Sequence, residues 1–118
     1  MILALDVSTS ITGVSVINEE GEVVLCSAID LRKHKDFFVK AEKIKEYLTV
    51  IKSDVKVTQV FIEQPFMFFN SGGSSAKTMA ALQRFNGVVS WITYVLFEVK
   101  PQYLTAGEAR RAVGIKVP

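Results

Sequence analysis

The stretch ILALDVSTSITGVSVIN (residues 2–18) decides the fold. Residues 2–5 predict a short apolar strand that stops at Asp6, and a turn of small polar residues follows. Residues 12–18 then alternate between apolar and polar side chains, which is typical of a strand with one buried face. Strands joined by such a tight connection run antiparallel. The chain therefore begins with a β-hairpin whose first strand ends in a carboxylate.

A third strand extends the hairpin into a meander, and a helix follows it. Residues 19–22 form a polar turn, and residues 23–29 predict a third strand. The period then becomes helical, and we expect a helix over residues 36–52 with Asp36 as its N-cap. Its predicted buried face consists of Phe38, Ala41, Ile44, Leu48 and Ile51.

Helix and strand alternate in the rest of the chain. Residues 57–62 lack alternation, which is typical of a parallel strand covered on both faces. A long helix is expected over residues 76–97, a fifth strand over residues 99–104, and a last helix after Thr105, which has capping-box spacing. We therefore predict a single α/β domain over residues 1–118. It has a mixed five-stranded sheet, an antiparallel three-strand meander plus two parallel strands, with helices on both faces.

Composition narrows the class of protein. The 118 residues are 49% hydrophobic and 22% charged, enough for one core without disulfides or structural metals. The single cysteine, Cys26, lies in an apolar run, and we expect a buried structural thiol. We expect no signal peptide and no membrane span, because the most apolar window, residues 88–99, is too short and carries Glu98. The expected location is the cytoplasm.

Charge is distributed unevenly along the chain. Residues 1–63 contain 8 Lys/Arg and 10 Asp/Glu, a balance of −2, whereas residues 64–118 contain 6 and 2, a balance of +4. Four cations of the second half are candidate phosphate contacts, although each would also suit a solvated surface: Lys77, Arg84, Arg110 and Arg111.

Two carboxylates are expected at one edge of the sheet. Asp6 ends the first strand and Glu63 ends the fourth, and ligands on such sheets bind beyond the carboxyl ends of the parallel strands. Asp6 could instead bond its own turn, beside a solvated Glu63. The pair could hold Mg²⁺ for phosphodiester hydrolysis. It could also act as acid and base on a sugar, but no apolar groove or further acid supports that role.

The second carboxylate lies within the segment FIEQPFMFFN (residues 61–70), and an aromatic run follows it. The three phenylalanines after Glu63, which are Phe66, Phe68 and Phe69, could be core, but all three can hardly be buried beside Gly72 and Gly73. An exposed ring can stack on the face of any base. The segment therefore fits a loop that touches nucleic acid beside the acidic pair.

Three segments resemble RuvC-type Holliday junction resolvases of the ribonuclease H-like nuclease superfamily. ILALDVSTSITGVSVIN resembles their opening hairpin, IEQPFMFFN their second motif, and VKPQYLTAGEARRAVGI their fifth strand and the start of the next helix. The resemblance implies a Mg²⁺- or Mn²⁺-dependent endonuclease that resolves four-way DNA junctions. Asp6 and Glu63 match two catalytic, metal-binding acids. Phe66 matches an aromatic inserted near the crossover, and Met67, Phe69 and Asn70 accompany it as DNA contacts.

The chain departs from the family pattern at its end. The further acids that resolvases carry on a last helix have no counterpart before Pro118. Either the sequence is a fragment without its C-terminal helix, which we expect, or the chain binds junctions without cutting them. A fragment would cleave poorly until extended by its natural downstream residues.

The long helix and two alternatives complete the predictions. Residues 76–97 are apolar nearly all round, which calls for a second cover beyond one sheet. Missing downstream residues could supply this cover, and so could a second subunit. RuvC-like resolvases are two-fold dimers, so we expect a homodimer through this helix, bound to branched DNA. The alternatives are a non-catalytic junction-binding dimer, and the phosphate-binding half of an actin-like or sugar-kinase-like ATPase. An RNA-processing relative of the fold stays open.

Overall fold

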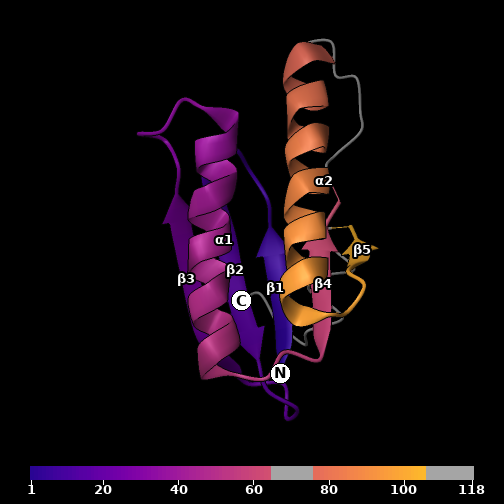
Figure 1. The fold of residues 1–118 in the computed structure, drawn as a ribbon. Coiled ribbons are helices and arrows are strands. Elements are labelled where there is room, and N and C mark those ends of the chain that lie inside the picture. The colour runs from indigo at the N-terminus through magenta and orange to yellow at the C-terminus, as the bar shows by residue number, and fades with distance from the viewer. Residues whose placement is uncertain (65–75, 106–118) are drawn as a thin grey trace, which may run out of the picture.

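The structure is a computed structural model that describes residues 1–64 and 76–105. One mixed sheet has the strand order β3-β2-β1-β4-β5 (Figure 1). The elements are β1 (Ile2–Asp6), β2 (Ile11–Ile17), β3 (Val23–Asp30), α1 (Phe37–Asp54), β4 (Gln59–Glu63), α2 (Ala76–Phe97) and β5 (Gln102–Leu104). The predicted mixed five-stranded sheet is thereby confirmed.

Strand direction brings four strand ends to one edge. β1 pairs antiparallel with β2, and β2 pairs antiparallel with β3, so β1 and β3 run the same way. β4 pairs parallel with β1, and β5 pairs parallel with β4. The carboxyl ends of β1, β3, β4 and β5 therefore share one side of the sheet, which we call the strand-end edge.

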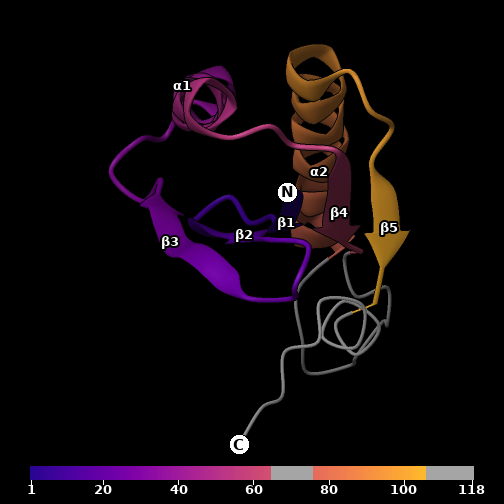
Figure 2. The same ribbon diagram turned by 90° about the horizontal axis from the view of Figure 1, so that it is seen from below.

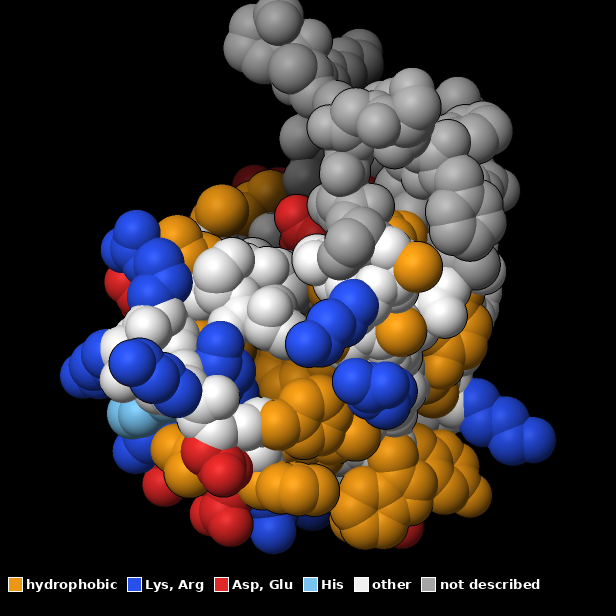
Figure 3. All heavy atoms as spheres, turned by 90° about the horizontal axis from the view of Figure 1, so that it is seen from above, with side chains coloured by type: hydrophobic (Ala, Val, Ile, Leu, Met, Phe, Trp, Pro, Cys, Tyr) orange, Lys and Arg blue, Asp and Glu red, His pale blue; other side chains and the backbone are white. Residues whose placement is uncertain are grey.

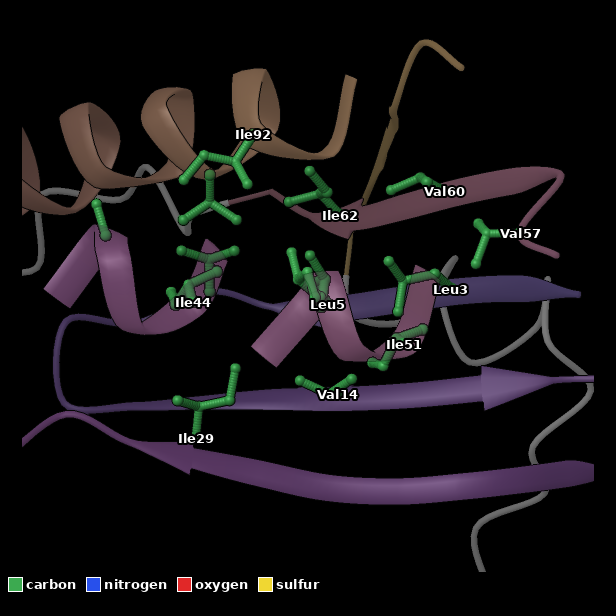
Figure 4. Close-up of a cluster of buried hydrophobic side chains, with 14 of the residues drawn as sticks. Leu3, Leu5, Val14, Ile29, Ile44, Ile51, Val57, Val60, Ile62 and Ile92 are labelled. Carbon is green, nitrogen blue, oxygen red and sulfur yellow. The ribbon is translucent and has the colours of Figure 1, made fainter. Parts of the chain in front are cut away.

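Both described helices cover the same face of the sheet, as the view along the strands shows (Figure 2). The core lies between this face and the helices (Figure 4). Leu3 and Leu5 of the central β1 and Val60 and Ile62 of β4 are buried there. The prediction of helices on both faces is therefore not met within residues 1–64 and 76–105. A further helix, predicted after Thr105, lies outside the described residues.

The start of α1 corrects one prediction by a single residue. Asp36 is the N-cap as predicted, and its carboxylate accepts hydrogen bonds from the amides of Phe38 and Val39. Phe38, however, is 73% exposed, so the prediction that it belongs to the core was wrong. Phe37 packs inward instead, with its ring 5.3 Å from that of Phe85 in an edge-to-face contact. Counted from Phe37, the spacing i, i+4, i+7 reaches Ala41 and Ile44, which are buried on the same face of α1. Because Phe37 and Phe38 are adjacent and alike, the sequence does not show which of them begins this face.

Helix α2 has the predicted bounds, but its faces differ from the expected apolar cylinder. Its buried side carries Phe85, Val89 and Ile92 together with polar residues, Asn86, Ser90 and Thr93. The opposite side exposes Trp91, Tyr94 and Val95, with Trp91 64% exposed. The sheet and α1 cover one side of α2, and an apolar surface remains on the other.

Two smaller differences follow from tertiary context. Cys26 is exposed, against the prediction of a buried thiol, because it lies on the edge strand β3, on the face away from the helices. β5 is shorter than expected because the turn after α2, where Glu98 has a φ of 59°, takes up residues 98–101. Within residues 1–64 and 76–105, no helix has the length and apolarity to span a membrane.

Candidate active site

Asp6 and Glu63 end neighbouring parallel strands at the strand-end edge. Leu5 is paired with Ile62, so the next residues along β1 and β4 are Asp6 and Glu63. Adjacent strands are about 4.8 Å apart, and residues at the same register position point to the same face. Leu5 and Ile62 point into the core below the helices, so both acids point to the opposite face. The structure thus brings the two predicted acids together.

The turn after Asp6 is stabilised without the carboxylate of Asp6. The hydroxyl of Thr12 accepts from the amide of Ser8 at 3.2 Å and donates to the carbonyl of Ser8 at 2.8 Å. The hydroxyl of Ser8 accepts from the amide of Ser10 at 3.1 Å. Asp6 is exposed, and its carboxylate makes no hydrogen bond or ion pair with any described residue. This argues against the alternative in which Asp6 serves only to cap its own turn.

The strand beside Asp6 leaves space around it. Gly13 of β2 is paired with Asp6, and a Cβ atom built on Gly13 would be 3.5 Å from the Cβ of Asp6. Because Gly13 has no side chain, nothing on β2 stands directly beside the carboxylate. Asp6 is therefore accessible from the solvent and from the face of the sheet opposite the helices.

The end of β4 is fixed by a buried residue of α2. Asn86 donates its side-chain N–H to the carbonyl oxygen of Glu63 at 3.3 Å, and the amide of Gln64 donates to the carbonyl of Leu104 at 2.7 Å. One peptide unit, between Glu63 and Gln64, is thus held from two sides. The sequence analysis missed Asn86; its signal is an amide side chain in the middle of an apolar helix.

Helix α2 projects beyond the strand-end edge and carries two of the predicted phosphate contacts. Asn86 lies level with Glu63, and nine residues of helix separate it from Lys77, so Lys77 lies about 13 Å further out at 1.5 Å per residue. Arg84 lies close to the level of the acids, and both cations are exposed. Figure 1 shows α2 rising past the strands at this end.

The other predicted DNA contacts cannot be placed. Phe66, Met67, Phe69, Asn70, Arg110 and Arg111 lie outside the described residues. Across residues 1–64 and 76–105, no cluster of three or more His, Cys, Asp or Glu could hold a metal ion. Asp6 and Glu63 fit a part of a Mg²⁺ shell, since that ion accepts one or two carboxylates and takes further oxygens from water and phosphate.

Comparison with known proteins supports the fold alone. No family model and no curated protein matches the sequence. The structure is similar to Thermus thermophilus RuvC in complex with a Holliday junction substrate, with a TM-score of 0.74 and 9% sequence identity, over 94% of this chain and 68% of that one. It is also similar to another structure of Thermus thermophilus RuvC, with a TM-score of 0.64 and 11% identity over 94% and 67%.

The chain has the ribonuclease H-like fold of these RuvC structures. At 9–11% sequence identity, this similarity supports the same fold and does not support the same catalytic activity.

Proposed function

We propose that this chain is the nuclease domain of a metal-dependent, structure-selective endonuclease that hydrolyses phosphodiester bonds in branched DNA. The observation that supports it most is the pair of acids, Asp6 and Glu63, at one register position of adjacent strand ends. This pair lies on a sheet that resembles that of a RuvC protein bound to a Holliday junction. We expect it to act in the cytoplasm, where nucleoid or viral DNA is copied.

Asp6 and Glu63 have the role of metal ligands in this proposal. A bound Mg²⁺ or Mn²⁺ would activate water and stabilise the leaving oxygen of the phosphodiester. The two carboxylates contribute negative charge that attracts the ion, and the open space beside Gly13 leaves room for the substrate. Asn86 is a positioning residue, because it holds the backbone of Glu63 against the sheet.

The proposed DNA surface has a positioning part and a junction-reading part. Lys77, on the projecting end of α2, and Arg84, close to the level of the acids, would contact phosphates, as Arg110 and Arg111 would. Phe66, with Met67, Phe69 and Asn70, would contact bases at the branch point. Phe66→Ala should therefore weaken binding to a four-way junction more than to linear duplex, by up to about 1–3 kcal/mol.

A titration and a cleavage assay together test the proposal. Mn²⁺ binding is measured by electron paramagnetic resonance, and cleavage is measured on a labelled four-way junction with Mg²⁺ or Mn²⁺. Asp6→Asn keeps the shape of the side chain and removes its charge, so we expect Mn²⁺ binding to be lost. In the chain extended by its natural downstream residues, cleavage should fall about a thousandfold, as expected for the loss of about 4 kcal/mol of metal-assisted stabilisation. Junction binding without metal should be unchanged. Full cleavage by Asp6→Asn would rule out this role.

One observation favours a second candidate, a junction-binding protein that does not cut. Among residues 1–64 and 76–105 only two acids meet at the strand ends, with no third acid close enough to complete a metal-binding group. Junction binding with no cleavage in either metal, by a chain extended by its natural downstream residues, would support this binder. The ATPase alternative predicts nucleotide binding, which a titration of the chain with ATP measures.

A homodimer through α2 is part of the proposal. Trp91, Tyr94 and Val95 are exposed together on the side of α2 that the sheet and α1 leave uncovered. Large apolar side chains gathered in this way favour association. A second copy of the chain would cover them by a two-fold contact that matches the symmetry of a four-way junction.

A further inference from the structure

The connection between β3 and α1, residues 31–36, lies at the strand-end edge beside the acidic pair. β3 ends at this edge because it runs in the same direction as β1. The amide of Leu31 donates to the carbonyl of Ser10 at 2.7 Å, and the ammonium of Lys40 donates to the carbonyl of Thr9. Both contacts reach the turn that follows Asp6. The connection and the start of α1 are therefore held against the turn next to the candidate active site.

The acidic residues that flank the connection are already engaged. Asp30 forms an ion pair with Arg32, with hydrogen bonds of 3.0 and 2.7 Å. Asp36 is the N-cap of α1, where its carboxylate accepts two backbone amides. Lys33 and Lys35 are exposed, and neither forms an ion pair with a described residue. Two ammonium groups without an ion pair among the described residues thus remain on the connection. Beyond the larger effect of the side-chain hydrogen bond from Arg32, the charge of Lys33 also contributes to the lowered pKa of Asp30.

Lysine and arginine side chains are spread across this end of the molecule. Figure 3 looks onto the strand-end edge and shows them on the side of the connection and again near the centre. Lys40 lies between the connection and the turn after Asp6, since it touches Thr9. Lys40, at the start of α1, therefore adds a cation between the connection and the turn that follows Asp6.

We infer that Lys33 and Lys35, with Lys40 beside them, bind the phosphate backbone of a DNA arm that leaves the acidic pair. The inference rests on the proposed function and adds a surface to it. Asp6 and the end of β3 are two strand spacings apart, about 10 Å. At about 3.4 Å per nucleotide along one strand, the connection meets the backbone about three nucleotides from the phosphate at the acids.

The chemistry of these groups decides what kind of contact they make. Lysine ammoniums are point charges without the paired geometry that arginine offers to a base edge. Phosphate contacts position a nucleic acid and carry no sequence information. Lys33 and Lys35 therefore hold duplex arms of any sequence and hold linear and branched DNA equally well. The branch point is read elsewhere.

Salt dependence of binding tests this surface in the full chain. Binding of a labelled duplex and of a four-way junction is measured by fluorescence anisotropy between 50 and 200 mM salt, without divalent metal. The double variant Lys33→Gln/Lys35→Gln removes two charges from the connection. A matched control, Lys52→Gln/Lys56→Gln, removes two charges from exposed lysines at the opposite end of the molecule.

Two lost phosphate contacts lower the slope of log affinity against log salt by about 1.8. Over a fourfold change in salt, the double variant should therefore lose about twelvefold less affinity than the unmodified chain, on both DNAs alike. The control should keep the original slope. An unchanged slope in the double variant, or an equal change in the control, overturns the inference and leaves the proposed function standing. If the unmodified chain binds neither DNA, the proposed function fails as well.

Discussion

Replacing Asn86 by alanine is expected to loosen the end of β4 and, with it, the position of Glu63. The amide of Asn86 is buried and donates to the carbonyl oxygen of Glu63 at 3.3 Å. One buried hydrogen bond of this kind contributes about 1 kcal/mol. The same peptide unit donates through Gln64 to Leu104, so the loss should show at the amide of Gln64. A local opening free energy that is lower by about 1 kcal/mol corresponds to about fivefold faster exchange of this amide.

Native-state hydrogen exchange followed by NMR measures this effect, and Ser90→Ala is the matched control. Ser90 is also buried in α2, but its hydroxyl donates within the helix, to the carbonyl of Asn86 at 2.7 Å. Both variants should lose about 1–2 kcal/mol of global stability, whereas only Asn86→Ala should speed exchange at Gln64 beyond that of amides in β1 and β2. Equal exchange at Gln64 in the two variants would refute the idea that Asn86 anchors the site.

Three further outcomes can be measured. Phe37→Ala should lower the free energy of unfolding in urea by about 2–3 kcal/mol, because its ring packs on the core, whereas Phe38→Ala should change it by no more than about 0.5 kcal/mol. The reverse order would support the sequence-based prediction that Phe38 belongs to the core. The side-chain hydrogen bond from Arg32 lowers the pKa of Asp30 from 3.8 to about 2, so its stabilisation is complete above pH 3.8 and is lost as the pH falls toward 2. Arg32→Gln should return the pKa of Asp30 toward 3.8 in an NMR titration, and an unchanged pKa would contradict the role of the Asp30–Arg32 ion pair. If α2 forms the dimer contact, Trp91→Ala should shift the mass in light scattering from dimer toward monomer without loss of stability, and a monomeric unmodified chain would end that proposal.

Local pattern was enough to predict most of the fold. The bounds of α2 and the N-cap of α1 followed from period and capping chemistry, which act within a few neighbouring residues. The placement of Asp6 and Glu63 at one edge also followed, because a meander followed by alternating helix and strand leaves few ways to arrange parallel neighbours.

What the sequence could not predict depends on which face of an element a distant element covers. Phe37 and Phe38 are equally apolar, and the position of Phe85 on α2 decides which of them packs against the core. Cys26 sits in an apolar run like a core residue, yet it lies on the face of an edge strand that the helices do not cover.

The role of Asn86 needed the tertiary structure for the same reason. Its amide is costly to bury unless it is hydrogen-bonded, and its partner at Glu63 is 23 residues away along the chain. The spacing of hydrophobic residues along a sequence indicates which side of a single helix or strand is buried. The pairing of a buried polar group with a strand end arises only when two elements pack, so the acids could be predicted from sequence while the residue that holds one of them could not.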